Sequence, residues 1–287
     1  MAGRASILAA AAAALAVAVL ALCPAALADP APLSRGADGH AVVALSTPSG
    51  TLHLALDTGA EASALTETAI ARLDLAPAPS GSAALTALTG QSHVNRYTLA
   101  GAQLGTLDLP ELSPAALADA PDSRGQLDGF LGLDALAGRG WRIDLAANRL
   151  ELIPGQPCAP GALSLPAIEG EINGRTVLVI IDTGLAGSVG NPALGRQLSR
   201  LPDRSARASI IGADGEAVPA RIMRARSFSA DGLVRRNVDI AIAGLPVFEA
   251  LGLDGRPALF AGMDLLDMSV ITLNLTGEGA CVAVDMP

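Results

Sequence analysis

Two aspartates stand at the same position in two similar segments, and paired carboxyl groups can activate water for hydrolysis. Asp57 lies in Leu54–Ser63 (LALDTGAEAS), and Asp182 lies in Val179–Ser188 (VIIDTGLAGS), 125 positions later. Two carboxyl groups about 3 Å apart cannot both ionise comfortably, so they share one proton. The ionised group can act as general base on a water while the protonated group acts as general acid. We therefore take Asp57 and Asp182 as the candidate catalytic residues, with no metal or cofactor required.

The residues beside each aspartate are expected to position the carboxyl groups rather than to react. Threonine hydroxyls can hold two loops together by hydrogen bonds to the backbone, and glycine lets backbone N–H groups approach a carboxylate closely. Ser63 and Ser188, six positions after each aspartate, either cap whatever follows the loop or take a direct part in the site. The four expected supporting residues are Thr58, Gly59, Thr183 and Gly184.

The similarity between the two parts of the chain extends downstream of the aspartates. Gly90 and Gly215 each lie 33 positions after their Asp. Alternating or β-branched residues surround both glycines, which predicts a hairpin at Ala84–Leu99 and another at Ala208–Met223. The first is expected to turn at Thr89 and Gly90, and the second at Ala213, Asp214 and Gly215. The match of several features at similar offsets indicates a duplicated architecture rather than two unrelated turns.

Further matched segments predict an all-β fold with few short helices. Phe130–Leu136 parallels Phe260–Leu266, and brief helical turns are expected after the glycine in each. A short helix is expected at Thr66–Leu73, with Thr66 as its N-cap. Strands are predicted at Trp141–Leu152 and Val270–Leu275, and most of the remaining chain reads as short strands separated by turn residues.

This order of motifs resembles the retropepsin-like aspartic proteases, in a bacterial, exported form with two halves in one chain. The resemblance runs from Val42 to Val284 and includes both Asp-Thr-Gly signatures. It implies two β-rich halves related by a pseudo-twofold axis, as in the retropepsin and pepsin folds. It also implies a monomeric aspartic endopeptidase that cleaves peptide or protein substrates without a cofactor. The hairpins would be flaps that close over the substrate, with Thr89, Gly90, Asp214 and Gly215 as flap residues.

Two departures from the family pattern keep other interpretations open. Pepsin-type enzymes usually have Ser or Thr directly after Asp-Thr-Gly, whereas Ala60 and Leu185 stand there in this chain. Leu185 favours an alternative in which the fold is a non-catalytic module that binds peptides or cell-envelope partners. A third interpretation treats both Asp-Thr-Gly segments as structural turns. Tyr97 lies on the return arm of the first hairpin and is expected to pack in a strand rather than act as a flap tyrosine.

The N-terminal segment has the features of a secretory signal. Arg4 precedes an apolar run from Ile7 to Leu22, and Ala26–Ala28 provides a small-residue cleavage site. Retention of this segment as an anchor is the alternative, but the run is short for a membrane span, so no stable membrane insertion is expected after its removal. We expect an exported protein, periplasmic or secreted. Its expected divisions are a signal peptide (1–28), a flexible leader (29–39), an N-terminal half (40–153), a linker (154–164) and a C-terminal half (165–287).

The net charge and the cysteine and histidine side chains disfavour some classes of partner and binding site. The net charge of −9 disfavours nucleic acid as a partner. Cys158 and Cys281 form either one disulfide or two unpaired thiols. Three scattered histidines do not provide the ligands of a structural zinc site, and each is expected to be an ordinary strand or surface residue. These are His40, His53 and His93.

Overall fold

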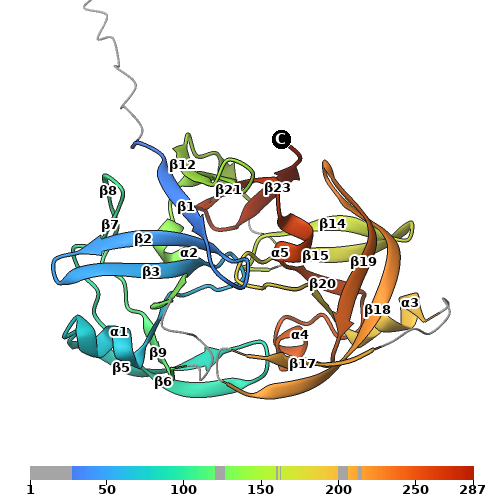
Figure 1. The fold of residues 1–287 in the computed structure, drawn as a ribbon, viewed down its shortest axis with the longest axis horizontal. Coiled ribbons are helices and arrows are strands. Elements are labelled where there is room, and N and C mark those ends of the chain that lie inside the picture. Colours follow the sequence, from blue (N-terminus) through green and yellow to red (C-terminus); the bar gives the residue numbers. More distant parts are fainter. Residues whose placement is uncertain (1–27, 120–126, 160, 162, 200–205, 213–214) are drawn as a thin grey trace, which may run out of the picture.

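The computed structural model describes residues 28–119, 127–159, 161, 163–199, 206–212 and 215–287. The expected signal peptide therefore lies outside the described residues except for Ala28, and so do Ala213 and Asp214 of the second expected hairpin. The described chain is mostly β, as the sequence predicts. Figure 1 shows two halves side by side, with strands that join them along the top of the view and two long hairpins along the bottom.

The first half forms a sheet whose strands bury alternate or consecutive apolar side chains. Strands in the middle of the sheet are largely buried. The strand that ends at Leu56, for example, buries each of its last three residues. The strands of this half are β2 (Ala41–Thr47), β3 (Gly50–Leu56), β4 (Ala64–Thr66), β5 (Pro77–Thr86), β6 (Gln91–Tyr97), β7 (Gln103–Leu104), β8 (Leu107–Asp108), β9 (Ala115–Leu117) and β10 (Gly129–Leu131).

The second half repeats the strand order of the first. The order is β2-β3-β10-β4-β9-β6-β5 in the first half and β14-β15-β20-β16-β19-β18-β17 in the second. In each half the third strand of this order runs parallel to the second and antiparallel to the fourth. The strands of the second half are β14 (Ala167–Ile172), β15 (Arg175–Ile181), β16 (Val189–Gly190), β17 (Ala206–Ile211), β18 (Ala217–Ala230), β19 (Leu233–Ile242) and β20 (Ala258–Ala261).

Strands from both halves combine in one part of the larger sheet. Strand β11 pairs antiparallel with β21 from Gly140↔Asn274 to Asp144↔Val270, so the halves share main-chain hydrogen bonds. The order there is β23-β21-β11-β12-β1-β2. These strands are β1 (Ala31–Arg35), β11 (Gly140–Asp144), β12 (Arg149–Ile153), β21 (Val270–Asn274) and β23 (Cys281–Asp285), and a separate pair is β13 (Pro157–Cys158) with β22 (Thr276–Gly277).

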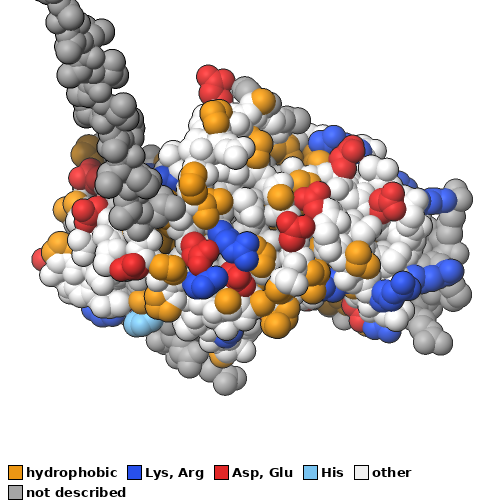
Figure 2. Space-filling model, turned by 90° about the horizontal axis from the view of Figure 1, so that it is seen from above, with side chains coloured by type: hydrophobic (Ala, Val, Ile, Leu, Met, Phe, Trp, Pro, Cys, Tyr) orange, Lys and Arg blue, Asp and Glu red, His pale blue; other side chains and the backbone are white. Residues whose placement is uncertain are grey.

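Charged side chains on the shared strands are largely paired. Arg142 lies 3.2 Å from Asp144, and Arg149 lies 2.7 Å from Glu151. Figure 2 shows the molecule from above, and acidic and basic side chains lie close together on that face, between hydrophobic ones. Neighbouring charges of opposite sign reduce the field that either would exert on a partner.

The helices are short and pack on the sheets. In the first of them, Thr66 accepts a hydrogen bond from the Ala69 N–H at 3.2 Å, which confirms the expected N-cap. Helical turns also follow Gly132 and Gly262, as predicted. The helices are α1 (Glu67–Arg72), α2 (Leu133–Leu136), α3 (Pro192–Leu198), α4 (Pro246–Ala250) and α5 (Met263–Leu266).

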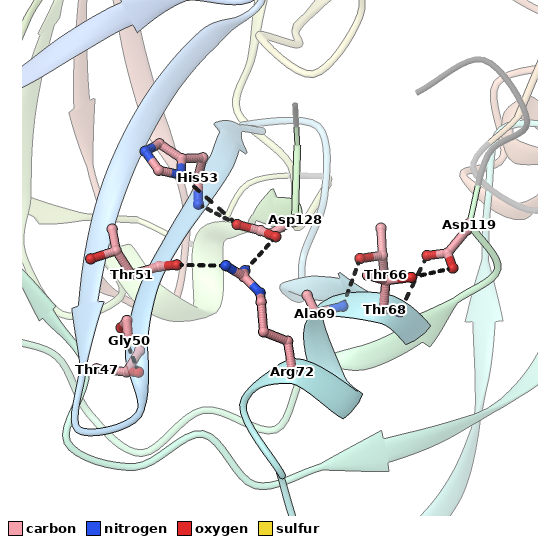
Figure 3. A network of polar contacts seen from close by, with 10 residues as sticks. All are labelled: Thr47, Gly50, Thr51, His53, Thr66, Thr68, Ala69, Arg72, Asp119 and Asp128. Atoms are coloured by element: carbon pink, nitrogen blue, oxygen red, sulfur yellow. Dashed lines mark hydrogen bonds and ion pairs between the residues drawn. The ribbon is translucent and has the colours of Figure 1, made fainter. Parts of the chain in front are cut away.

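A polar network ties α1 to the first sheet (Figure 3). Arg72 on this helix pairs with Asp128, the residue before β10, at 2.5 Å, and it also donates to the Thr51 carbonyl oxygen of β3 at 3.4 Å. The other carboxylate oxygen of Asp128 accepts from the backbone N–H of His53 at 2.8 Å. The network therefore fixes α1 against β3 and β10, the two strands that end beside Asp57.

Two expectations about the elements were wrong. Residues 29–39 were expected to be a flexible leader, but Ala31–Arg35 form β1, which pairs with β12 and β2. Ala31 and Leu33 are buried, and this apolar contact holds the segment in the fold. The first half therefore begins before residue 40. Trp141–Leu152 was expected to be one strand, but it is the hairpin β11–β12, which turns through Asn148 in a left-handed conformation (φ 52°).

One apolar core runs through both halves. It includes fully buried residues from each, such as Leu54 and Trp141 from the first half and Phe228 and Phe260 from the second. Two parts of the protein that share a core and a sheet form one folding unit. Within the described residues, no helix is long and apolar enough to cross a membrane.

Candidate active site

The two aspartates of the Asp-Thr-Gly segments lie at equivalent ends of equivalent strands. Asp57 follows β3 and donates its backbone N–H to Leu131 of β10 at 2.9 Å. Asp182 follows β15 and donates its backbone N–H to Ala261 of β20 at 3.0 Å. The apolar segments ending before Gly132 and Gly262 therefore pack beside the aspartate loops. Parallel pairing with a buried strand fixes the direction in which each loop leaves its sheet.

The threonines after each aspartate lock the two loops together. The Thr58 hydroxyl donates to the Ile181 carbonyl oxygen, and the Thr183 hydroxyl donates to the Leu56 carbonyl oxygen, both at 2.6 Å. Each hydroxyl also accepts the backbone N–H of the other threonine at 3.1 Å. Both threonines are fully buried. The reciprocal hydrogen bonds hold the loops in a fixed relation across the halves.

The glycines after the threonines contact both carboxyl groups. The Gly59 N–H donates to Asp57 Oδ1, and the Gly184 N–H donates to Asp182 Oδ1, both at 2.9 Å. A methyl group on Gly59 would overlap the carboxyl group of Asp182, and one on Gly184 would overlap that of Asp57. Only glycine therefore permits each loop to approach the carboxyl group of the other half.

The two carboxyl groups meet and titrate as a pair. The Asp57 and Asp182 side chains are hydrogen-bonded to each other, and Asp182 is buried while Asp57 is partly exposed. Burial raises the pKa of Asp57 to about 6. Burial, followed by the negative charge of Asp57, raises the pKa of Asp182 well above its usual value. The raised pKa values therefore belong to the pair, which shares one proton.

The serines and two further aspartates support the loops from behind. Ser63 donates to Asp134 at 2.7 Å and accepts the Gly132 N–H at 3.0 Å. In the second half, Ser188 donates to Asp264 at 2.6 Å and accepts the Gly262 N–H at 2.9 Å. The serines thus brace the aspartate loop against the adjacent strand and helix. Sequence reasoning did not single out Asp134 and Asp264, although both stand at the same place in the matched segments.

Leu185 occupies the same backbone position as Ala60. The N–H groups of Ala60 and Leu185 are hydrogen-bonded to Asp57 and Asp182 respectively, and both bonds lower the pKa of their carboxyl group. The carbonyl oxygens of Ala60 and Leu185 each accept an N–H from the first residue of the short helix behind the loop, at 2.9 and 2.7 Å. The bulk of the leucine side chain leaves this backbone geometry intact.

His40 is a site residue that sequence reasoning missed. It was expected to be an ordinary strand or surface residue, but it is buried in the turn before β2, and its Nε2 lies 2.9 Å from the Gly184 carbonyl oxygen. Its charge lowers the pKa of Asp57, opposing the effect of burial. No repeated pattern could have revealed it, because the second half has no matching histidine. His53 and His93 are exposed on strands, as expected.

Comparison with known proteins agrees with this geometry. The family model for aspartyl proteases matches residues 49–135 and 168–264, one stretch in each half. This chain belongs to the aspartyl protease family. Each matched stretch contains one Asp-Thr-Gly segment and the strand behind it, and ends within the short helix that follows. No curated protein matches the sequence.

The hairpins expected as flaps are both present in this aspartyl protease. Strands β5 and β6 pair up to Thr86↔Gln91, and the turn closes with a bond from the Ala87 N–H to Gly90 at 2.8 Å. Gly90 does not adopt a positive φ, so this turn does not depend on the freedom of glycine. In the second hairpin, β17 pairs with β18 and Gly215 has a φ of 81°. Tyr97 packs against the core.

The remaining candidate residues of the aspartyl protease lie away from the dyad. Cys158 and Cys281 are joined in a disulfide, with their Cα atoms 5.8 Å apart. It connects β13, in the expected linker, to β23 near the C-terminus. Among the residues that the structure describes, no group of three or more His, Cys, Asp or Glu side chains is arranged to hold a metal ion.

Proposed function

We propose that this aspartyl protease is an active aspartic endopeptidase that hydrolyses peptide bonds with a water activated by Asp57 and Asp182. The main support is the hydrogen-bonded carboxyl pair, in which each carboxyl accepts an N–H from the glycine two residues further along its own loop. The backbone hydrogen bonds of Leu185, which match those of Ala60, support the enzyme over a non-catalytic binding module. One chain supplies both carboxyl groups, so the enzyme should act as a monomer.

In the proposed reaction the partly exposed Asp57 acts as the base and the buried Asp182 as the acid, since burial favours the neutral form of a carboxyl group. Asp57 removes a proton from the water, whose oxygen attacks the carbonyl carbon of the substrate. Asp182 donates its proton to the carbonyl oxygen, which gives a neutral tetrahedral diol. The diol then returns a proton to Asp182 as its carbonyl re-forms, and Asp57 delivers the proton it took to the departing nitrogen. The C–N bond breaks, and the carboxyl pair regains its single shared proton.

The hairpins give the proposed enzyme a means of holding an extended peptide. In this proposal, substrate adds as a strand to backbone groups near Thr89 and Gly90 and near Asp214 and Gly215, with its side chains alternating into pockets. Those pockets should favour aliphatic side chains, because aromatic residues make up only 2% of the chain whereas 51% of it is hydrophobic.

We also propose that the protein acts outside the cytoplasm, in the periplasm or as a secreted enzyme. The disulfide between Cys158 and Cys281 supports this location, because structural disulfides persist in oxidising compartments. The segment 1–28 would direct export and then be removed. N-terminal sequencing of the protein recovered from outside the cytoplasm tests the cleavage site, which is expected after Ala28.

The activity is tested by incubating the purified protein, residues 29–287, with a mixed peptide library across acidic to mildly alkaline pH. Cleavage is expected to appear as pH rises through about 6, where Asp57 ionises, and to fall again when the shared proton is lost. Asp57→Asn and Asp182→Asn should each abolish it. The control is Asp254→Asn, since Asp254 is exposed. No cleavage by the unmodified protein at any pH would favour the peptide-binding alternative.

A further inference from the structure

The two halves differ in polarity at a position beside the carboxyl pair. Continuing the antiparallel register of β2 and β3 by two residues places His40 opposite Asp57. The same continuation of β14 and β15 places Leu165 opposite Asp182. Leu165 is buried and apolar, whereas His40 carries two ring nitrogens. The pseudo-twofold arrangement is therefore broken by a polar side chain on one side only.

His40 reaches across the halves to the loop that touches both carboxyl groups. Its Nε2 lies 2.9 Å from the carbonyl oxygen of Gly184. The N–H of this same glycine donates to Asp182, and its Cα packs against the carboxyl group of Asp57. A displacement of the Gly184 peptide would thus change the surroundings of both carboxyl groups. The histidine ring holds this peptide in place.

Both ring nitrogens of His40 face oxygen atoms that can only accept. Nε2 faces the Gly184 carbonyl, and Nδ1 lies 2.8 Å from Asp38 Oδ2. This contact does not have the geometry of a hydrogen bond. Carbonyl and carboxylate oxygens repel a bare ring nitrogen and attract an N–H group. A proton on Nε2 is therefore needed for the contact with the Gly184 carbonyl oxygen.

We propose that His40 is a positioning residue that fixes the second aspartate loop through the Gly184 carbonyl and makes the surroundings of the two carboxyl groups unequal. The carboxyl groups then have separate roles because their neighbours differ, although their own loops are equivalent. The effect on turnover rests on the proposed function, whereas the effect on the titration of Asp57 does not.

The charged groups around His40 agree with this role. Asp38 faces the ring from the turn between β1 and β2, and Asp57 lies across from it at the end of β3. Arg35 of β1 approaches the same turn, but its side chain pairs with Asp267 at 2.6 Å. The positive charge of His40 lowers the pKa of Asp57 and so opposes burial on that side. Opposite charges within a few ångströms favour each other's ionised forms.

The first test follows the titration of the aspartate side chains by carboxyl 13C NMR, which needs no substrate. His40→Leu, which copies the residue of the second half, is expected to raise the titration of Asp57 by about one pH unit. His40→Gln should raise it similarly, because glutamine can donate to Gly184 but carries no charge. His53→Gln is the matched control at an exposed histidine and should leave it unchanged. An unchanged Asp57 titration in either folded His40 variant would overturn the proposal.

Imidazole 15N NMR of the unmodified protein gives a second readout that does not depend on the folding of any variant. Nε2 of His40 is expected to carry a proton, which it donates to the Gly184 carbonyl oxygen. An Nε2 without a proton would overturn the proposal as well.

The kinetic test distinguishes two effects of His40: its contact with the Gly184 loop and the effect of its charge on the pKa of Asp57. His40→Leu should lower kcat about 10-fold or more with a smaller change in KM, because the reacting groups are misplaced. His40→Gln should recover most of kcat while the acidic limb of the pH profile stays shifted to higher pH. Equal kcat and equal pH profiles in all three proteins would contradict a positioning role. If the unmodified protein cleaves no peptide, the proposed function fails, and the two NMR measurements still decide the role of His40.

Discussion

The Cα of Gly184 packs against the carboxyl group of Asp57, so closely that a methyl group would overlap it. Gly184→Ala must therefore displace either the loop or the carboxyl group. We expect kcat/KM to fall by about 100-fold, since a shift of roughly 1 Å in a reacting group costs that much. Gly187→Ala is the matched control, because the same loop has open space at Gly187. Steady-state kinetics with a cleaved peptide measures both, and equal activity in the two variants would contradict the close packing.

The reciprocal threonine bonds should contribute to stability as well as to activity. Thr58→Val keeps the shape of the side chain but leaves the Ile181 carbonyl oxygen and the Thr183 N–H without their hydroxyl partner. Buried polar groups that lose a partner cost about 1–3 kcal/mol each. We expect urea unfolding to show a loss of this order, together with a lower kcat. Thr51→Val, at an exposed position of β3, should change neither.

The raised pKa values predict that the carboxyl pair destabilises the protein at neutral pH. The folded protein keeps protons that the unfolded chain releases near pH 3.8, so the pair's contribution to stability is complete below that pH. It is lost as pH rises through the folded pKa, which is about 6 for Asp57. Asp182→Asn should therefore raise the free energy of unfolding at pH 7 by about 1–3 kcal/mol. Urea unfolding at pH 3.5 and pH 7 measures the difference, which should vanish at the lower pH.

Most substitutions of buried residues destabilise a protein. A gain in stability of Asp182→Asn at pH 7 would therefore distinguish the predicted effect from this general loss. Asp254→Asn serves as the control at an exposed carboxylate and should have the same stability as the unmodified protein at both pH values. An Asp182→Asn protein that is less stable at pH 7 would show that the carboxyl pair is not held protonated in the folded state.

The disulfide should stabilise the protein because it closes a long loop. Cys158 and Cys281 are 123 positions apart, and cross-links over long loops remove much conformational entropy from the unfolded chain. We expect Cys158→Ser with Cys281→Ser to lower the free energy of unfolding by about 2–4 kcal/mol. The carboxyl pair lies elsewhere, so kcat should be retained by the folded double variant. Equal stability with and without reducing agent would contradict this role.

Much of the site could be predicted because the chain contains it twice. Two Asp-Thr-Gly segments, each followed by a hairpin and an apolar segment at similar offsets, gave a comparison within one sequence. The positions of Asp57 and Asp182 at strand ends followed from that comparison, as did the loop contacts of Thr58 and Thr183. Chemistry then explained why those residue types must meet.

Features present only once were harder to predict. His40 has Leu165 at the equivalent position, so the comparison between halves could not mark it. Strand β1 (Ala31–Arg35) lies in a segment rich in proline and glycine, and only its pairing with distant strands gives it order. Asn148 turns the chain between β11 and β12 without a glycine or proline to mark the turn. Each of these depends on contacts with residues far away in the sequence.

The antiparallel pairing of β11 with β21 also affects the order in which the protein can fold. During synthesis from the N-terminus, β11 emerges long before residues 270–274 have been made. Its hydrogen-bonding edge stays unpaired during that time, and open edges invite association between chains. A ribosome-bound chain that stops before residue 270 should therefore be prone to aggregate, and the cell must keep it from its neighbours until the last strands arrive.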